Sequence, residues 1–165
     1  MTHRLTCRVY YEDTDLAGIV YYANYLKFIE RGRSEWVRER GLDQGRLRDR
    51  SGIVFAVRRV VADYLAPARF DDLIEVRTDL RELGGARIVL DQSVWRGAQR
   101  LFAAEVTLVA LGPDGRAHRL PGAVRQALAG GAQDVSSFGP SHRPNEVQAG
   151  GQVPRGLFAP RGDVM

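Results

Sequence analysis

The chain is short and basic, and these properties exclude several classes of protein. It has 165 residues, 44% of them hydrophobic and 27% charged, which is typical of a globular protein with one core. The formal net charge is +4, but the basic residues alternate with acidic ones and form no run, which argues against nucleic-acid binding.

The N-terminus has no apolar segment of the kind that begins a signal peptide, and no stretch approaches 18 apolar residues. We therefore expect a cytoplasmic protein that does not span a membrane. Cys7 is the only cysteine, so no disulfide can form within the chain, and we expect it to be a small buried apolar residue.

Residues 4–12 are rich in β-branched and aromatic side chains, which predicts a first strand. Asp13, Thr14 and Asp15 follow, and these residue types capture nearby backbone groups and end strands. Gly18 permits a backbone conformation closed to other residues, or the close approach of a ligand.

Residues 23–40 have helical periodicity, with Tyr25, Ile29, Gly32 and Trp36 spaced four, three and four apart. A glycine within a helix costs roughly 1 kcal/mol. Gly32 therefore predicts that this helix lies close against a sheet.

Residues 42–52 hold many charges and two glycines, which predicts a loop. Pro67 indicates an edge or a corner, and Pro121 begins a short helix that ends near Ala129. Strands are predicted at 53–65, 73–83, 86–96 and 100–111, with hairpin turns at 84–85 and 96–100.

One strand, one long helix and four more strands leave no room for repeated parallel crossovers. The predicted class is α+β, with an antiparallel sheet and the helix packed on one face. Residues 1–129 form the predicted domain. Residues 130–165 hold seven of the 18 glycines and four of the seven prolines, which predicts a disordered tail, with residues 156–159 as a weak docking segment.

The junction between the first strand and the helix carries the candidate chemistry. Asp15 has a purely structural interpretation, because Asp is a preferred N-cap residue. It also has a functional one: the first helical N–H groups, near Tyr22 and Ala23, have no intrahelical partner and can stabilise a developing oxyanion. A carboxylate nearby could then attack a carbonyl carbon or deprotonate water.

The substrate of such a site needs a good leaving group, because no histidine, cysteine or lysine accompanies the carboxylates and no metal-ligand spacing is present. A thiol, with a pKa of about 8.5 by comparison with cysteine, leaves with little help. Thioesters therefore suit this site better than amides.

The stretch from Arg8 to Tyr25, with Asp13, Asp15 and Gly18 in its turn, resembles the signature of hotdog-fold acyl-CoA thioesterases of the 4-hydroxybenzoyl-CoA thioesterase type. It is most similar to the branch associated with the Tol-Pal cell-envelope system. Residues 61–72 are also similar to that family, and the resemblance extends from residue 4 to about residue 128.

The resemblance implies a five-stranded antiparallel sheet wrapped around one long helix, in a homodimer or homotetramer with active sites at a subunit interface. It implies that Asp15 is the catalytic carboxylate and that Asp13 holds the turn. It further implies substrate binding by Gly18, by the backbone N–H of Tyr22 and, through the CoA phosphates, by Arg87. Many members of the Tol-Pal branch have histidine in place of Tyr22.

The leading prediction is an acyl-CoA thioesterase without cofactor or metal, in which Asp15 acts as nucleophile or general base. The carrier of the acyl group is CoA, with acyl carrier protein as the other candidate. An alternative is a module that binds acyl-CoA or acyl carrier protein without hydrolysis, linked to cell-envelope lipid metabolism. A third hypothesis, nucleic-acid binding, depends on the basic charge alone.

Overall fold

The computed structural model describes residues 1–130, and the predicted tail lies outside them from residue 131 onward, as do residues 156–159. Both predictions about that part of the chain therefore stay predictions. The described elements, in chain order, are β1 (His3–Arg8), a 3-10 turn (Tyr11–Asp13), α1 (Asn24–Glu39), α2 (Gln44–Ser51), β2 (Val54–Tyr64), β3 (Leu73–Leu83), β4 (Arg87–Arg96), β5 (Gln99–Leu111) and α3 (Gly122–Leu128).

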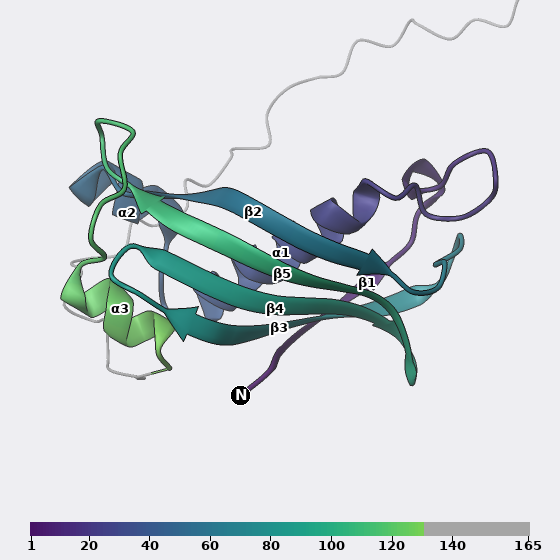
Figure 1. Cartoon of the computed structure of the whole chain (residues 1–165). Coiled ribbons are helices and arrows are strands. Elements are labelled where there is room, and N and C mark those ends of the chain that lie inside the picture. Colours follow the sequence, from purple (N-terminus) through teal and green to yellow (C-terminus); the bar gives the residue numbers. More distant parts are fainter. Residues whose placement is uncertain (131–165) are drawn as a thin grey trace, which may run out of the picture. The chain divides into compact units, whose positions relative to one another are not determined.

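The five strands form one sheet in the order β1-β3-β4-β5-β2, and every neighbouring pair is antiparallel (Figure 1). Strands β1 and β2 are therefore the two edges. Side chains alternate along β3, since Ile74, Val76 and Thr78 are buried while the residues between them are more accessible. The predicted α+β class with an antiparallel sheet is confirmed.

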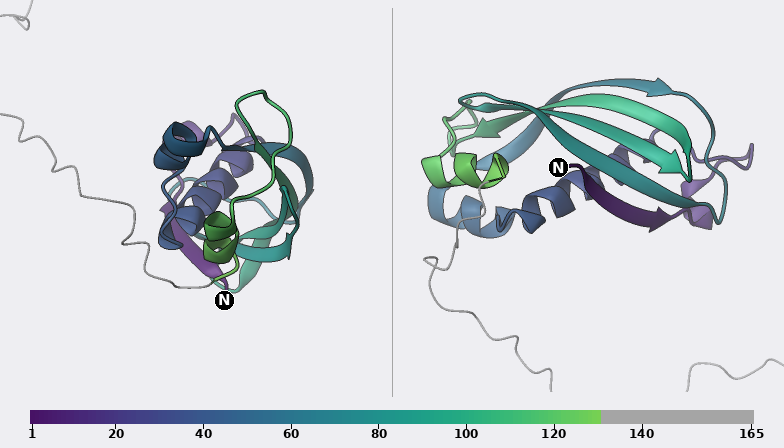
Figure 2. Two further views of the ribbon diagram at one scale, coloured as in Figure 1. Left: turned by 90° about the vertical axis from the view of Figure 1, so that its left-hand side faces the viewer. Right: turned by 90° about the horizontal axis from the view of Figure 1, so that it is seen from below.

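Helix α1 packs on one face of the sheet, which curves around it (Figure 2). Phe28, Ile29 and Trp36 are fully buried between helix and strands. At Gly32, an added Cβ would lie 2.6 Å from Val76 Cγ1 and 3.2 Å from Thr78 Oγ1. The prediction that Gly32 marks a close approach of helix and sheet is confirmed.

The predicted end of the first strand was wrong. Strand β1 ends at Arg8, and residues 11–13 form a 3-10 turn instead of continuing it. The physical reason is the carboxylate of Asp13, whose Oδ2 accepts a hydrogen bond from the Tyr10 N–H at 2.8 Å and turns the chain back on itself.

The prediction of a loop at 42–52 was also wrong, because residues 44–51 form helix α2. Asp43 caps it, since its Oδ1 accepts from the Arg46 N–H at 3.0 Å, and this bond lowers the pKa of the Asp43 carboxyl. Gly52 ends it with a φ of +67°. A single apolar residue, Leu47, gives the helix no periodic pattern to detect.

Cys7 is half-buried and packs against the core, where burial raises the pKa of its thiol. Among residues 1–130, no helix combines the length and the apolar character needed to cross a membrane.

Candidate active site

Asp13 anchors the junction between the 3-10 turn and helix α1. It is 5% exposed, and its carbonyl oxygen accepts two hydrogen bonds, from the Tyr21 N–H at 2.9 Å and from the Asn24 side-chain amide at 2.9 Å. Its carboxylate Oδ2 also accepts from the Tyr10 N–H. Asp13 thus holds the turn both by its carbonyl oxygen and by its side chain.

Residues 14–20, here called the Asp15 loop, form a small hairpin closed by a bridge between Thr14 and Val20. The Asp15 N–H donates to the Ile19 carbonyl at 2.9 Å, and the Gly18 N–H donates to the Asp15 carbonyl at 3.0 Å. Gly18 has a φ of +74°, which agrees with the expected conformation closed to other residues. The loop thus holds Asp15 by its backbone.

The Asp15 side chain is half-buried and only partly engaged. Its Oδ1 accepts from the Ala17 N–H at 2.9 Å, and no donor within residues 1–130 pairs with Oδ2. The second oxygen is therefore available to a substrate or a water molecule.

Helix α1 begins without a side-chain cap. Its N-cap residue is Ala23, so the interpretation of Asp15 as the N-cap is wrong. The Asn24 N–H donates to the Tyr21 carbonyl at 2.8 Å. In contrast, the backbone N–H groups of Tyr22, Ala23 and Tyr25 have no backbone acceptor among residues 1–130. Ala23 and Tyr25 belong to the free N–H groups of the helix N-terminus, and the Tyr22 N–H directly precedes them.

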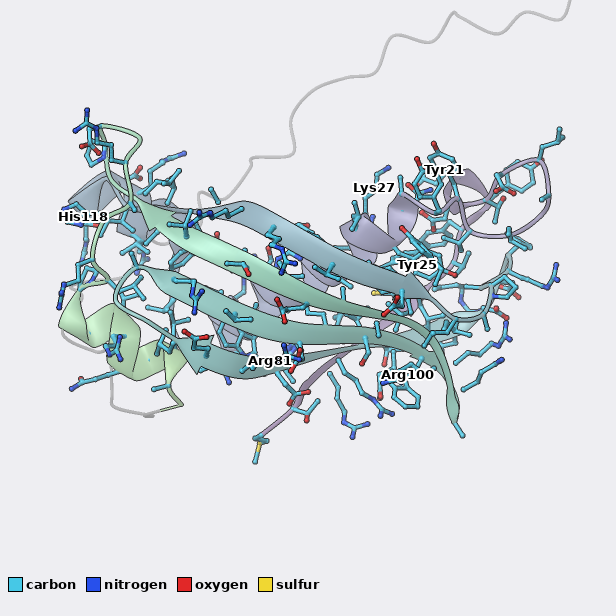
Figure 3. The ribbon with its side chains drawn as sticks, viewed as in Figure 1. Tyr21, Tyr25, Lys27, Arg81, Arg100 and His118 are labelled. Atoms are coloured by element: carbon cyan, nitrogen blue, oxygen red, sulfur yellow. The ribbon has the colours of Figure 1, made fainter. Side chains whose placement is uncertain are left out.

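Asp15 and this uncapped helix start share one cavity of about 410 Å³. Its wall is mostly apolar and aromatic, and it comes from the Asp15 loop, the start of α1 and the end of β2. The lining residues are Asp15, Ile19, Val20, Tyr21, Tyr22, Tyr25, Tyr64, Leu65, Ala66 and Pro67. Figure 3 shows Tyr21 and Tyr25 together at this end of the sheet.

The aromatic side chains of the cavity pack on one another. The ring of Tyr25 stacks on Phe102 with centroids 5.1 Å apart, and Tyr64 meets both rings edge-on at 5.6 and 5.2 Å. Burial raises the pKa of both tyrosine hydroxyls. Tyr22 is 61% exposed and meets Tyr64 edge-on at 6.1 Å.

Tyr64 is a site residue that the sequence reasoning missed. Its hydroxyl donates a hydrogen bond to the carbonyl of Tyr22 at 3.0 Å, so the end of β2 is tied to the start of α1. The only signal was its place within residues 61–72, the second stretch that is similar to the thioesterase family. No local pattern brings residues 42 positions apart together.

The structure does not bring Arg87 to the cavity of its own chain. Arg87 begins β4, where it pairs with Glu82, and this ion pair raises the pKa of its guanidinium. Arg96, at the other end of the same strand, donates to the carbonyl of Pro67 in the cavity wall. Ten strand residues span about 33 Å. Arg87 thus lies at the end of the sheet that carries His118 in Figure 3.

Residues 1–130 contain no group of three His, Cys, Asp or Glu side chains that could hold a metal ion. The cavity thus combines one carboxylate, from Asp15, with one residue whose backbone N–H is unpaired, Tyr22, and with an aromatic wall.

A five-stranded antiparallel sheet that curves around a single long helix defines the class of hotdog-fold proteins. The model of the thioesterase superfamily matches residues 17–103, and the chain belongs to this family. The matched segment begins two residues after Asp15, so it does not itself assign a role to that residue.

Two named relatives match this chain over most of their own length. The acyl-CoA thioesterase YbgC of Haemophilus influenzae is 41% identical over 99 residues, which are 60% of this chain and 73% of that protein. The acyl-CoA thioester hydrolase YbgC of Escherichia coli O157:H7 is 39% identical over 111 residues, which are 67% of this chain and 82% of that protein.

The solved structure of a 4-hydroxybenzoyl-CoA thioesterase variant, in complex with 4-hydroxybenzoyl-CoA, superposes with a TM-score of 0.72. The match covers 77% of this chain and 98% of that one at 23% identity, which shows that the fold is shared. The predicted hotdog fold and thioesterase family are confirmed.

Proposed function

We propose that this chain is an acyl-CoA thioesterase, which hydrolyses its substrate to the free acid and CoA with Asp15 as the reacting carboxylate. The observation that carries the proposal is the position of Asp15: this residue, with an unpaired carboxylate oxygen, and Tyr22, with an unpaired N–H, line one mostly apolar cavity. The relatives named acyl-CoA thioesterase support the same activity.

In the proposed reaction, the thioester carbonyl oxygen accepts a hydrogen bond from the Tyr22 N–H at the start of α1. This donor stabilises the negative charge that develops on that oxygen. Asp15 either attacks the carbonyl carbon, giving a mixed anhydride that water then hydrolyses, or removes a proton from the attacking water. In both routes the C–S bond breaks and the CoA sulfur leaves as thiolate, which needs little acid catalysis.

Thiol release from short, long and aromatic acyl-CoA substrates tests the proposal. Asp15→Asn keeps the size of the side chain and an oxygen that can accept from Ala17, but it removes the charge. We expect kcat to fall by about 10²-fold or more, since a positioned base or nucleophile contributes at least that much.

Asp71→Asn is the matched control, because Asp71 is an exposed carboxylate whose φ of +68° Asn also adopts readily. Its kcat should stay within twofold of the native value. Full activity in Asp15→Asn would contradict the assignment of Asp15. Tight binding of acyl-CoA by the native chain without turnover would instead favour the non-hydrolytic binding module.

Gly18 and Arg87 belong to the same proposal. The positive φ of Gly18 supports a role in shaping the loop that presents Asp15. Arg87 is exposed and could meet CoA phosphates only where a second subunit brings it near an Asp15 cavity. Arg87→Ala should then raise the KM for acyl-CoA but not the KM for an acyl-pantetheine, which lacks the nucleotide. A KM for acyl-CoA that is the same in the variant as in the native chain would contradict this role.

We propose a homo-oligomer as the working assembly, with edge strand β2 at an interface between copies. No residue of β2 is buried in the single chain. Val57 and Val60 pair with Leu108 and Val106 on the core face of the sheet, yet they are 49% and 36% exposed. An exposed apolar edge strand favours association with another chain.

Three finer assignments have tests of their own. Membership of the Tol-Pal-associated branch depends on the resemblance of residues 8–25, and co-purification of the tagged chain with Tol-Pal proteins tests it. A cytoplasmic location is tested by cell fractionation. Comparing kcat/KM for one acyl group on CoA and on acyl carrier protein decides between the two carriers.

A further inference from the structure

Asn24 is the residue through which the two halves of the candidate site are connected. It is the first residue of α1, is only 7% exposed, and does not line the cavity. Its side chain and its backbone both make hydrogen bonds within the junction, and each bond fixes a different half.

The side-chain bond fixes the half that carries the carboxylate. The Nδ2 of Asn24 donates to the Asp13 carbonyl at 2.9 Å, in a buried position. The peptide unit of that carbonyl leads directly into Thr14 and Asp15. Without this donor, the Asp13 carbonyl would keep only its bond from the Tyr21 N–H.

The backbone bond fixes the half that carries the donor to the substrate. The Asn24 N–H donates to the Tyr21 carbonyl at 2.8 Å. That carbonyl belongs to the same peptide unit as the Tyr22 N–H, which points away from it because a trans peptide places the two groups on opposite sides. The Asn24 backbone thus orients the proposed oxyanion donor.

We propose that Asn24 is a positioning residue, which sets the distance between the Asp15 carboxylate and the Tyr22 N–H. This inference rests on the proposed function of Asp15. A single buried side chain is suited to this role because it contacts the loop and the helix at once, and neither the 3-10 turn nor the Asp15 loop has another side-chain bond to the α1 helix.

The test compares Asn24→Ala with Gln92→Ala. Gln92 is a matched control: it is 2% exposed, and its amide Nε2 likewise donates to a backbone carbonyl, that of Ile29 in α1, at 2.8 Å. It lies outside the cavity, on the sheet face that α1 covers. Both variants lose a buried amide, but only Asn24→Ala loosens the Asp15 loop.

For Asn24→Ala we expect kcat to fall by about 10²-fold, the effect of displacing a reacting group by an ångström, with KM within threefold because the cavity wall is unchanged. For Gln92→Ala we expect an equal or larger loss of thermal stability, because the Gln92 side chain also bonds Thr78 and Arg33, with kcat within twofold. Each rate is divided by the fraction of the protein that is folded. Asn24→Leu, which is close in size and lacks the donor without burying a charge, replaces Asn24→Ala if that variant does not fold.

A kcat within twofold of native in the folded Asn24 variants, while Asp15→Asn is inactive, would overturn this inference alone. An equal kcat loss in Gln92→Ala would overturn it as well, since the effect would then be one of stability. Full activity in Asp15→Asn would overturn the proposed function and this inference together.

Discussion

Two tyrosines of the cavity use their hydroxyl groups in opposite ways. The Tyr64 hydroxyl donates to the Tyr22 carbonyl at an accessible position, whereas the Tyr25 hydroxyl accepts from the buried N–H of Ala68 at 2.9 Å. The first bond supports the start of α1, and the second satisfies a donor that water cannot reach. The same chemical deletion should therefore have different consequences at the two positions.

We expect Tyr64→Phe to lower kcat by about two- to tenfold, which corresponds to one hydrogen bond of modest strength. Tyr25→Phe should instead cost about 1–3 kcal/mol of unfolding free energy, because the Ala68 N–H is left buried and unpaired. Urea unfolding and steady-state kinetics of both variants test this pair. Equal changes of kcat and of unfolding free energy in the two variants would contradict these separate roles.

At the scale of single residues, sequence reasoning found groups that act near their own position in the chain. Asp15, Gly18 and Tyr22 lie within eight residues, and their turn and helix-start chemistry is local. Tyr64 could not be found in this way, because only the folded sheet brings β2 against α1.

At the scale of elements, the strands were predictable because their side chains alternate between two environments. Strand β3 has the predicted bounds, β4 and β5 differ from theirs by one residue at one end, and β2 differs by one residue at each end. Helix α2 was missed because it is a surface helix with no apolar stripe. Only its two ends carried a sequence signal: Asp43, which caps the start of the helix, and Gly52, which ends it in a left-handed backbone conformation.

Gly32 gives an element-scale prediction. Gly32→Ala should destabilise the protein by about 1–3 kcal/mol, because the new Cβ would overlap Val76 and Thr78 and force α1 away from the sheet. The intrinsic gain of about 1 kcal/mol for Ala in a helix offsets only part of this. Thermal or urea unfolding measures the change.

Gly122→Ala is the control for this substitution. Gly122 begins helix α3, and a Cβ built there meets no atom within 4 Å. Its stability should stay the same or rise slightly. A Gly32→Ala protein as stable as the Gly122→Ala protein would mean that helix and sheet have room that the coordinates do not show.

At the scale of the whole molecule, the exposed core face of β2 predicts how copies associate. We expect Val60→Lys to leave the fold intact, since the residue lies on an edge strand. The substitution should lower both the molecular mass of the oligomer in solution and its thioesterase activity. Light scattering after size-exclusion chromatography measures the mass, and circular dichroism verifies the fold.

Val61→Lys is the paired control, because Val61 is 45% exposed on the same strand but faces the opposite side of the sheet, where it pairs with Glu105. It should keep the native mass. If Val60→Lys also keeps both mass and activity, the core face of β2 is not the interface.

The uncapped start of α1 has a consequence for stability. A capping side chain at position 23 would add about 1 kcal/mol to most proteins, and this chain has alanine there instead. A capping side chain there would accept from the N–H of Tyr25 or Leu26, whereas the thioester oxygen of the proposed reaction binds the Tyr22 N–H, which precedes the helix. Engineering a serine into position 23 should therefore make the resting protein more stable and leave the proposed oxyanion donor free for its substrate.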